Sequence, residues 1–299
     1  MNVNLLTDAK KHNLALMKIS SYHKFKGDNV YLNGVGCFDL TYGSWLFDFS
    51  QKGICDIEGG PGIDIEKKLP EKFEACKPDY TLFDLDYSVG FTWAYCPRKC
   101  SFCIVPRQNN SKIHNSIWTF HDSKFKKICL LNNNTFSDPD WKETFEEIWD
   151  ADLRVIDENG YDLRLINEEK ADALKKTKFK GRIHYAWDFM KDEKKIIEGL
   201  KIAPKGMVYV LINYNTTIEE DLYRCEIINK NGFDPYIMPF RKTPETWKFK
   251  EFIDRRAYWK YENMTEGWNN YQGKKFKRFI DTRMYRKYKT IEMAWKDYQ

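Results

Sequence analysis

The order of strand and helix signals after residue 85 is the feature that most limits what this chain can fold into. Short apolar stretches of strand length alternate with longer amphipathic stretches. The candidate strands are 86–91, 127–131, 162–166, 182–187, 207–212 and 235–238, and the candidate helices are 141–152, 168–177, 192–202 and 218–231. Such alternation is typical of parallel sheets with right-handed crossovers. We therefore predict an α/β protein whose core, residues 81–242, forms a partial (β/α)6 TIM-like barrel with its site at the carboxyl ends of the strands.

The last candidate helix of this core has clear start and stop signals. Thr217 followed by Glu220 has the spacing of a capping box, in which a hydroxyl caps an early amide and a carboxylate reaches back. Asn231-Gly232 supplies a left-handed stop. These signals predict a helix between Thr217 and Asn231.

The core is flanked by two further segments. Residues 1–80 are predicted to form a small α/β domain, with a helix at 13–23 and a strand at 30–32. Residues 243–299 are predicted to be helical, basic and aromatic. The last 33 residues hold nine Lys or Arg and three Asp or Glu, a net charge of +6. This segment is therefore a candidate nucleic-acid contact, although a solvated helix with one packed face explains the same pattern.

Composition limits the location of the protein. No run of about 18 uncharged apolar residues exists, so we expect no membrane-spanning helix and no membrane partner. The first residues lack the basic start and apolar stretch of a signal peptide. We therefore expect a cytoplasmic protein, whose 8 Cys are thiols or metal ligands rather than disulfides.

Three of these cysteines have the spacing of a metal site. Cys96, Cys100 and Cys103 form a Cys-x3-Cys-x2-Cys pattern directly after the first candidate strand of the core. Three thiolates on one tight loop can bind three irons of a 4Fe–4S cluster and leave the fourth iron open for a ligand. Zinc is the alternative metal, although a structural zinc site needs a fourth ligand nearby. Unligated core cysteines are the remaining interpretation.

This loop resembles the signature of the radical S-adenosylmethionine (radical SAM) superfamily, and the resemblance extends over residues 85–260. The turn Asn132-Asn133-Asn134 occupies the place where the superfamily often has Gly-Gly-Glu, which is absent here. The segments 160–164, 186–188, 211–217 and 234–239 resemble the ends of later barrel strands. Residues 1–80 are similar, more weakly, to a degenerate cobalamin-binding-like domain, and they lack its Asp-x-His-x-x-Gly motif.

The resemblance implies an enzyme with two cofactors, a 4Fe–4S cluster and S-adenosylmethionine. An electron from a donor such as flavodoxin or ferredoxin would cleave S-adenosylmethionine to a 5′-deoxyadenosyl radical, which abstracts hydrogen from an unidentified substrate. Cys96, Cys100 and Cys103 would be the cluster ligands. The implied S-adenosylmethionine contacts are Phe102 beside adenine, Asn132 and Asn134 at the amino group, Arg164 at the carboxylate and Asp188 at the ribose.

The remaining cysteines leave two other functions open. Cys37, Cys55 and Cys76 resemble in outline the three cysteines that bind a second cluster in tRNA-modifying methylthiotransferases, although small buried side chains explain them as well. Cys129 and Cys225 are expected in the core. A non-catalytic metal-binding protein that binds nucleic acid is the other alternative. Iron content and cleavage of S-adenosylmethionine separate these readings.

Overall fold

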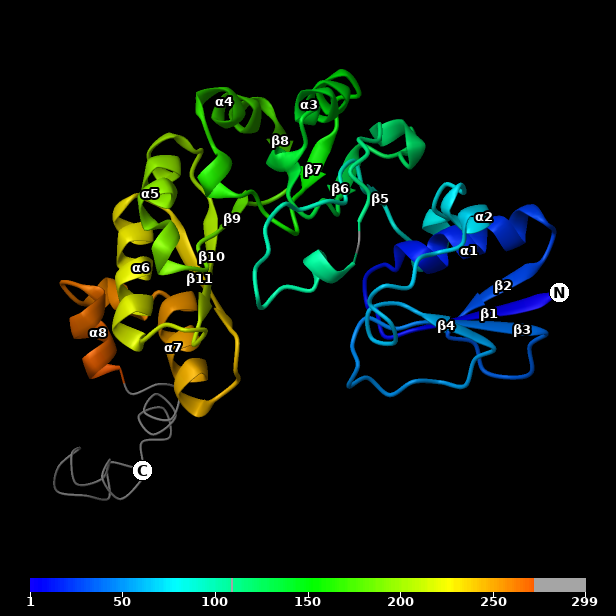
Figure 1. Cartoon of the computed structure of the whole chain (residues 1–299), viewed down its shortest axis with the longest axis horizontal. Coiled ribbons are helices and arrows are strands. Elements are labelled where there is room, and N and C mark those ends of the chain that lie inside the picture. Colours follow the sequence, from blue (N-terminus) through cyan, green and yellow to red (C-terminus); the bar gives the residue numbers. More distant parts are fainter. Residues whose placement is uncertain (109, 272–299) are drawn as a thin grey trace. The chain divides into compact units, whose positions relative to one another are not determined.

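The computed structural model describes residues 1–108 and 110–271, which form a mixed α/β fold with parallel sheets. The chain divides into two compact units, whose helices and strands are labelled in Figure 1. The first unit comprises Met1–Tyr161 and Glu169–Arg182, and the second comprises Asp162–Glu168 and the described part of Ile183–Gln299. Each unit has its own sheets and helices and is described by itself below.

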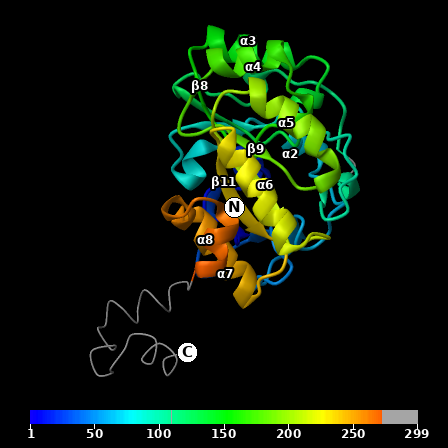
Figure 2. The same ribbon diagram turned by 90° about the vertical axis from the view of Figure 1, so that its left-hand side faces the viewer.

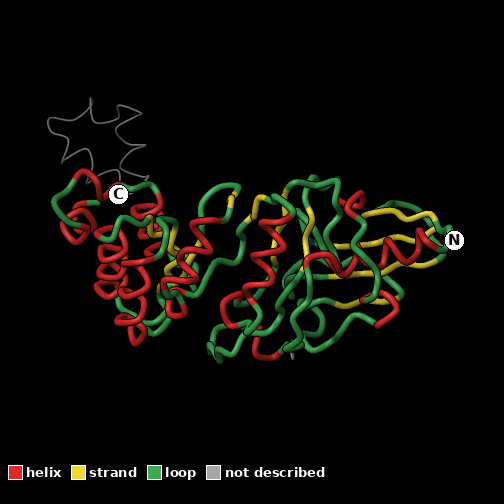
Figure 3. The backbone as a smooth tube through the Cα atoms, turned by 90° about the horizontal axis from the view of Figure 1, so that it is seen from above, coloured by secondary structure: helices red, strands yellow, loops and turns green. Residues whose placement is uncertain are grey.

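The first unit begins with a four-stranded parallel sheet in the order β2-β1-β3-β4. Its strands are β1 (Asn2–Thr7), β2 (Asn29–Leu32), β3 (Leu40–Ser44) and β4 (Ile57–Gly59). Helix α1 (Leu14–Phe25) starts at Asn13, whose side chain accepts a hydrogen bond from the Leu16 amide at 3.2 Å. Its apolar side packs on the sheet, and the short helix α2 (Glu71–Glu74) lies against it. Long loops connect the later strands (Figure 3).

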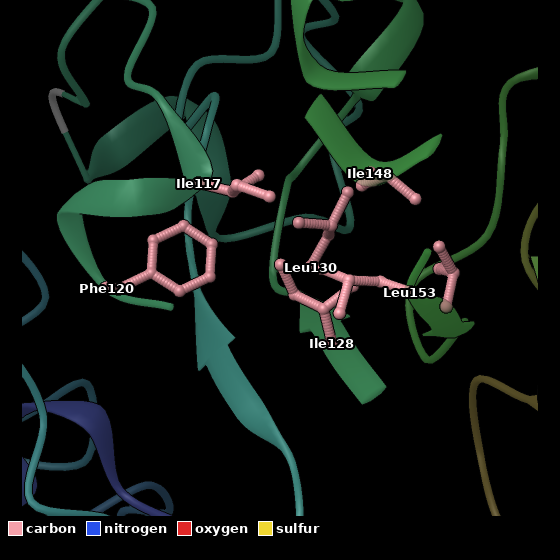
Figure 4. Close-up of a cluster of buried hydrophobic side chains, with 7 residues drawn as sticks. Ile117, Phe120, Ile128, Leu130, Ile148 and Leu153 are labelled. Carbon is pink, nitrogen blue, oxygen red and sulfur yellow. The ribbon is translucent and has the colours of Figure 1, made fainter. Parts of the chain in front are cut away.

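A second parallel sheet completes the first unit, with its strands in the sequential order β5-β6-β7-β8. These are β5 (Ser88–Gly90), β6 (Lys127–Leu130), β7 (Arg154–Ile156) and β8 (Lys178–Phe179), with helices α3 (Trp141–Asp150) and α4 (Glu168–Lys176) between the later ones. One face of the sheet buries a cluster of apolar side chains (Figure 4). The cluster consists of Ile117, Phe120, Ile128, Leu130, Ile148, Leu153 and Val155. This core fixes β6 and β7, and β5 is paired with β6. The carboxyl ends of β5 and β6 carry the cysteine loop and the asparagine turn.

The second unit holds a three-stranded parallel sheet in the order β11-β10-β9. Its strands are β9 (His184–Ala186), β10 (Met207–Ile212) and β11 (Asp234–Pro239), and its helices are α5 (Glu193–Ile202), α6 (Ile218–Lys230), α7 (Pro244–Asp254) and α8 (Met264–Asn270). Alternate residues of β10 are buried, as the period of a strand requires. Helix α6 packs against β10 and β11 (Figure 2), and it starts with the expected capping box of Thr217 and Glu220.

One strand predicted from the sequence is wrong. Of the other five, 207–212 is found with the predicted bounds and four are found with shifted ends. Residues 162–166 form a 3-10 helix, Leu163–Leu165, and the third strand of the core is β7. The Asp162 carboxylate accepts a hydrogen bond from the Arg164 amide at 3.1 Å, and such a local bond favours a turn over a strand. The α/β class with parallel strands is confirmed. Closure of the strands into a barrel, and the expected domain boundaries, stay predictions.

The C-terminal segment is helical as far as it is described. Helices α7 and α8 bury Phe249, Phe252, Ile253 and Met264. The basic residues from Lys274 to Lys296, which suggested a nucleic-acid contact, lie outside the described residues. Within residues 1–108 and 110–271, no helix has the length and apolar character needed to cross a bilayer.

Candidate functional site

The cysteine loop lies where the sequence predicted it, beyond the carboxyl end of β5. Cys96, Cys100 and Cys103 belong to a stretch without helix or strand, and each is half-buried. The Cys103 amide donates to the Cys100 carbonyl at 3.0 Å, which gives the middle of the loop a tight turn. Phe102 lies within this turn and is also half-buried. The three thiols thus remain within reach of solvent and of a ligand.

The asparagine turn follows β6 and joins this loop. Because β5 and β6 are parallel neighbours, their carboxyl ends meet at the same edge of the sheet. The Asn134 side-chain amide lies 3.8 Å from the Cys96 sulfur, within hydrogen-bonding range of a sulfur acceptor. Asn133 donates to the Ala94 carbonyl at 2.6 Å. The structure therefore brings together two of the predicted site residues, Cys96 and Asn134.

Asn132 fastens the start of the cysteine loop to this turn. Its side-chain oxygen accepts from the amides of Thr92 and Trp93 at 2.9 and 3.0 Å. Its amide nitrogen donates to the hydroxyls of Thr92 and Thr135 at 2.8 and 3.3 Å. With these four bonds, both side-chain atoms of this buried residue are engaged within the fold. A contact of Asn132 with the amino group of S-adenosylmethionine stays a prediction, and it would require one of these bonds to be exchanged.

A histidine–carboxylate pair at the same edge was not predicted from the sequence. The His114 Nδ1 atom lies 2.7 Å from the Asp138 carboxylate, which is almost fully buried. The next residue, Asn115, donates its amide to the Thr92 carbonyl at 2.9 Å. The pair therefore joins the chain that follows the cysteine loop to the segment before α3. His114 and Asp138 are far apart in the sequence, and no spacing motif indicates that they pair in the fold.

The donor chemistry of the loop fits an iron–sulfur cluster, because cysteine thiolates are the usual ligands of such a cluster and three of them can bind three of its irons. Within residues 1–108 and 110–271, however, no three Cys, His, Asp or Glu side chains are gathered closely enough to hold a metal ion. This holds for the cysteine loop and for Cys37, Cys55 and Cys76, the candidates for a second cluster. No disulfide joins any of the eight cysteines, all of which are described. Cys129 and Cys225 are fully buried, as expected.

Arg164 and Asp188, the other predicted contacts, belong to the second unit. The Arg164 guanidinium contacts Asp162 at 2.7 Å through Nε and Asp192 at 2.6 Å through a terminal nitrogen. Burial acts to lower the pKa of Arg164, but the bonds and charges of these two carboxylates outweigh it and raise the pKa. The fork expected to bind a ligand carboxylate is therefore already paired with protein carboxylates.

Asp188 follows β9 and has a strongly shifted pKa. Burial raises this pKa from 3.8 to about 6, against the charges of Arg164 and Arg224, which lower it. A carboxyl group with such a pKa can hold or release a proton near neutral pH.

Arg224 of α6 is a further residue that sequence reasoning missed. Its side chain is fully buried and donates to the carbonyls of Trp187 and Leu211, each at 2.7 Å. It also pairs with Asp221 on the same helix. These carbonyls lie at the carboxyl ends of β9 and β10, so one buried cation fixes the backbone next to Asp188. A lone arginine in an amphipathic helix carries no sequence signal for this position.

Comparison with known proteins adds no relative to this description. No family model, no curated protein and no solved structure matches the chain.

Proposed function

We propose that this chain is a radical SAM enzyme that binds one 4Fe–4S cluster through Cys96, Cys100 and Cys103 and acts with S-adenosylmethionine on a substrate still to be identified. The observation that carries the proposal is the junction of the cysteine loop with the asparagine turn, where the Asn134 amide lies 3.8 Å from the Cys96 sulfur. When bound, the cluster would supply one electron to S-adenosylmethionine, whose sulfonium C–S bond would break to give methionine and a 5′-deoxyadenosyl radical for hydrogen abstraction.

The cysteine loop provides the metal donors, and its two neighbours position it. Asn132 holds the loop's start at Thr92 and Trp93. Because these three thiols do not form a group that could hold a metal ion, we expect metal binding to be coupled to a rearrangement of the loop. The Asn134 amide donates toward the Cys96 sulfur, and hydrogen bonds to ligand sulfurs are one way in which a protein sets a cluster's reduction potential.

Four further residues are proposed to contact S-adenosylmethionine. Phe102 would pack near its adenine, Asn134 would bind its amino group, Arg164 its carboxylate and Asp188 its ribose. For Arg164 this requires that the ligand carboxylate replace or join Asp162 and Asp192 on the guanidinium. Asp188 is suited to accept a hydrogen bond when ionised and to donate one when protonated.

The proposed enzyme needs an electron donor, because a cluster of this kind is reduced from outside. A flavodoxin or a ferredoxin is the proposed partner, in the cytoplasm. The alternative is a tRNA-modifying, methylthiotransferase-like enzyme that uses the basic C-terminal segment to bind tRNA. Such an enzyme needs a second cluster, and no observation on Cys37, Cys55 and Cys76 favours a second cluster here.

The test is anaerobic purification and reconstitution with iron and sulfide, followed by dithionite and S-adenosylmethionine. Iron per chain and 5′-deoxyadenosine are measured. The variant with Cys96, Cys100 and Cys103 all replaced by Ala is compared with Cys37→Ala, which removes an exposed cysteine elsewhere.

We expect about four irons per chain and 5′-deoxyadenosine in the wild type and in Cys37→Ala, and neither in the triple variant. About eight irons would favour the methylthiotransferase-like alternative. Zinc in place of iron, or a cluster that never cleaves S-adenosylmethionine, would reject the enzyme and leave the metal-binding, nucleic-acid-binding alternative.

A further inference from the structure

The N-terminal sheet of the first unit has a cavity of about 260 Å³ on the face that α1 covers in part. Helix α1 packs on β1 and β3, where Val3, Leu5 and Tyr42 join its apolar side. Strand β4 is an edge strand, and its Ile57 remains 48% exposed. The cavity lies over β3 and β4, between α1 and the segment 67–73. It is therefore a gap in the cover of this sheet.

The walls of the cavity are apolar. Ala15 and Ile19 of α1, Ile57 of β4 and Leu69 and Phe73 of the covering segment line it. A cavity of this size has the volume of roughly nine water molecules, so it holds a ligand of about eight to ten non-hydrogen atoms. Ligand sites of this kind are typically concave and mostly apolar, with few polar groups.

The polar groups of the floor are already satisfied by the protein. The Tyr42 hydroxyl lies 3.1 Å from His23 Nε2, and the Ser44 hydroxyl lies 2.9 Å from the Asn13 side-chain nitrogen. Neither hydroxyl is therefore an unused donor or acceptor at the cavity. The floor selects for apolar groups.

The rim of the cavity is positively charged. Of the described residues that line it, Lys67, Lys68 and Lys72 are exposed and Glu58 is the single acidic one, so these side chains carry a net charge of +2. The Lys67 ammonium donates to the Glu58 carbonyl at 2.6 Å. The Lys72 ammonium lies 4.8 Å from the centre of the Phe73 ring. These contacts hold two of the cations at the entrance, where an anionic head group would lie while an apolar tail fills the gap.

We propose that this cavity binds a small amphipathic carboxylate, with an apolar chain of about eight carbons inside and the carboxylate at Lys67, Lys68 and Lys72. The site belongs to the N-terminal sheet and does not depend on a metal cluster or on the proposed function.

Two substitutions fill the cavity from different sides. Ala15→Trp places a large ring in it from α1. Gly59→Leu fills it from β4, because a Cβ on Gly59 would meet only the Lys67 side chain, at 3.8 Å, and its φ is not positive. Ala75→Trp is the matched control, since Ala75 is exposed beside α2 and does not line the cavity.

The experiment is equilibrium dialysis of the full chain against labelled octanoate, with octylammonium and 1-octanol as probes of the same chain length. We expect saturable octanoate binding that is at least tenfold tighter than that of octylammonium and tighter than that of 1-octanol. Ala15→Trp and Gly59→Leu should each weaken it at least tenfold, whereas Ala75→Trp should not. Lys68→Glu together with Lys72→Glu should weaken it about fivefold or more, because attraction becomes repulsion at the entrance.

Three results would overturn the proposal. They are the absence of saturable binding at millimolar octanoate, equal binding in a folded cavity-filling variant and in the wild type, and octylammonium binding as tight as that of octanoate. Circular dichroism of each variant identifies one that does not fold, and the second filling variant then decides.

Discussion

Replacing Asn132 by alanine should release the start of the cysteine loop. The Asn132 side-chain oxygen accepts from the amides of Thr92 and Trp93, and all three residues are buried. Leaving a buried donor without a partner costs about 1–3 kcal/mol, so two donors cost about 2–6 kcal/mol. Water that enters the site offsets part of this cost. We expect the free energy of local opening to fall by about 3 kcal/mol, which makes exchange of these two amides roughly a hundredfold faster.

The assay is native-state hydrogen exchange, followed by mass spectrometry of a peptide that covers residues 90–95. Asn133→Ala is the matched control, because Asn133 is only half-buried and its side chain donates to a single carbonyl, that of Ala94. It should change exchange of the same peptide by less than about fivefold. Unchanged exchange in Asn132→Ala would show that another contact, and not Asn132, holds the loop.

Three further predictions concern the second unit and the thiols. Arg224→Met leaves the buried Asp221 carboxylate without its cationic partner and should lower the free energy of unfolding by about 3–5 kcal/mol. The double variant with Asp221→Asn should recover part of this loss. A loss below about 1 kcal/mol in denaturant titration would contradict the prediction. Asp188 binds its proton more tightly in the folded state, so its contribution to stability is present below pH 3.8 and lost as pH rises to about 6. The free energy of unfolding, measured across this interval, should show the loss in the wild type and not in Asp188→Asn. Burial raises the pKa of the Cys129 thiol to about 12, so iodoacetamide at pH 8 should leave Cys129 unmodified in the folded protein and modify the half-buried Cys96. Peptide mass mapping that shows the reverse would contradict the burial of Cys129.

Much of the fold followed from local signals in the sequence. Strand β10 and the capping box of α6 were placed correctly, because a six-residue apolar strand and a Thr-x-x-Glu start are local features. Strand β7 was missed, and the segment predicted in its place is turned by the Asp162 side chain.

The candidate site was predictable only where its residues are close in sequence. The spacing of Cys96, Cys100 and Cys103 is visible in the sequence, and the asparagine turn was found as the end of a predicted strand. The pairing of His114 with Asp138 and the contacts of Arg224 with two strand ends were not predictable, because they depend on which segments meet in the fold. The same reason explains why the engagement of Arg164 by two carboxylates was not foreseen.

We propose that the three cysteines hold a cluster with one iron open to S-adenosylmethionine. Electron paramagnetic resonance of the reconstituted, dithionite-reduced protein tests this, with and without S-adenosylmethionine labelled with nitrogen-15 at its amino group. We expect a 4Fe–4S signal that changes on addition of S-adenosylmethionine and shows coupling to the labelled nitrogen. A signal that S-adenosylmethionine leaves unchanged, or a protein that binds no iron while the Asn132 contacts are intact, would contradict it.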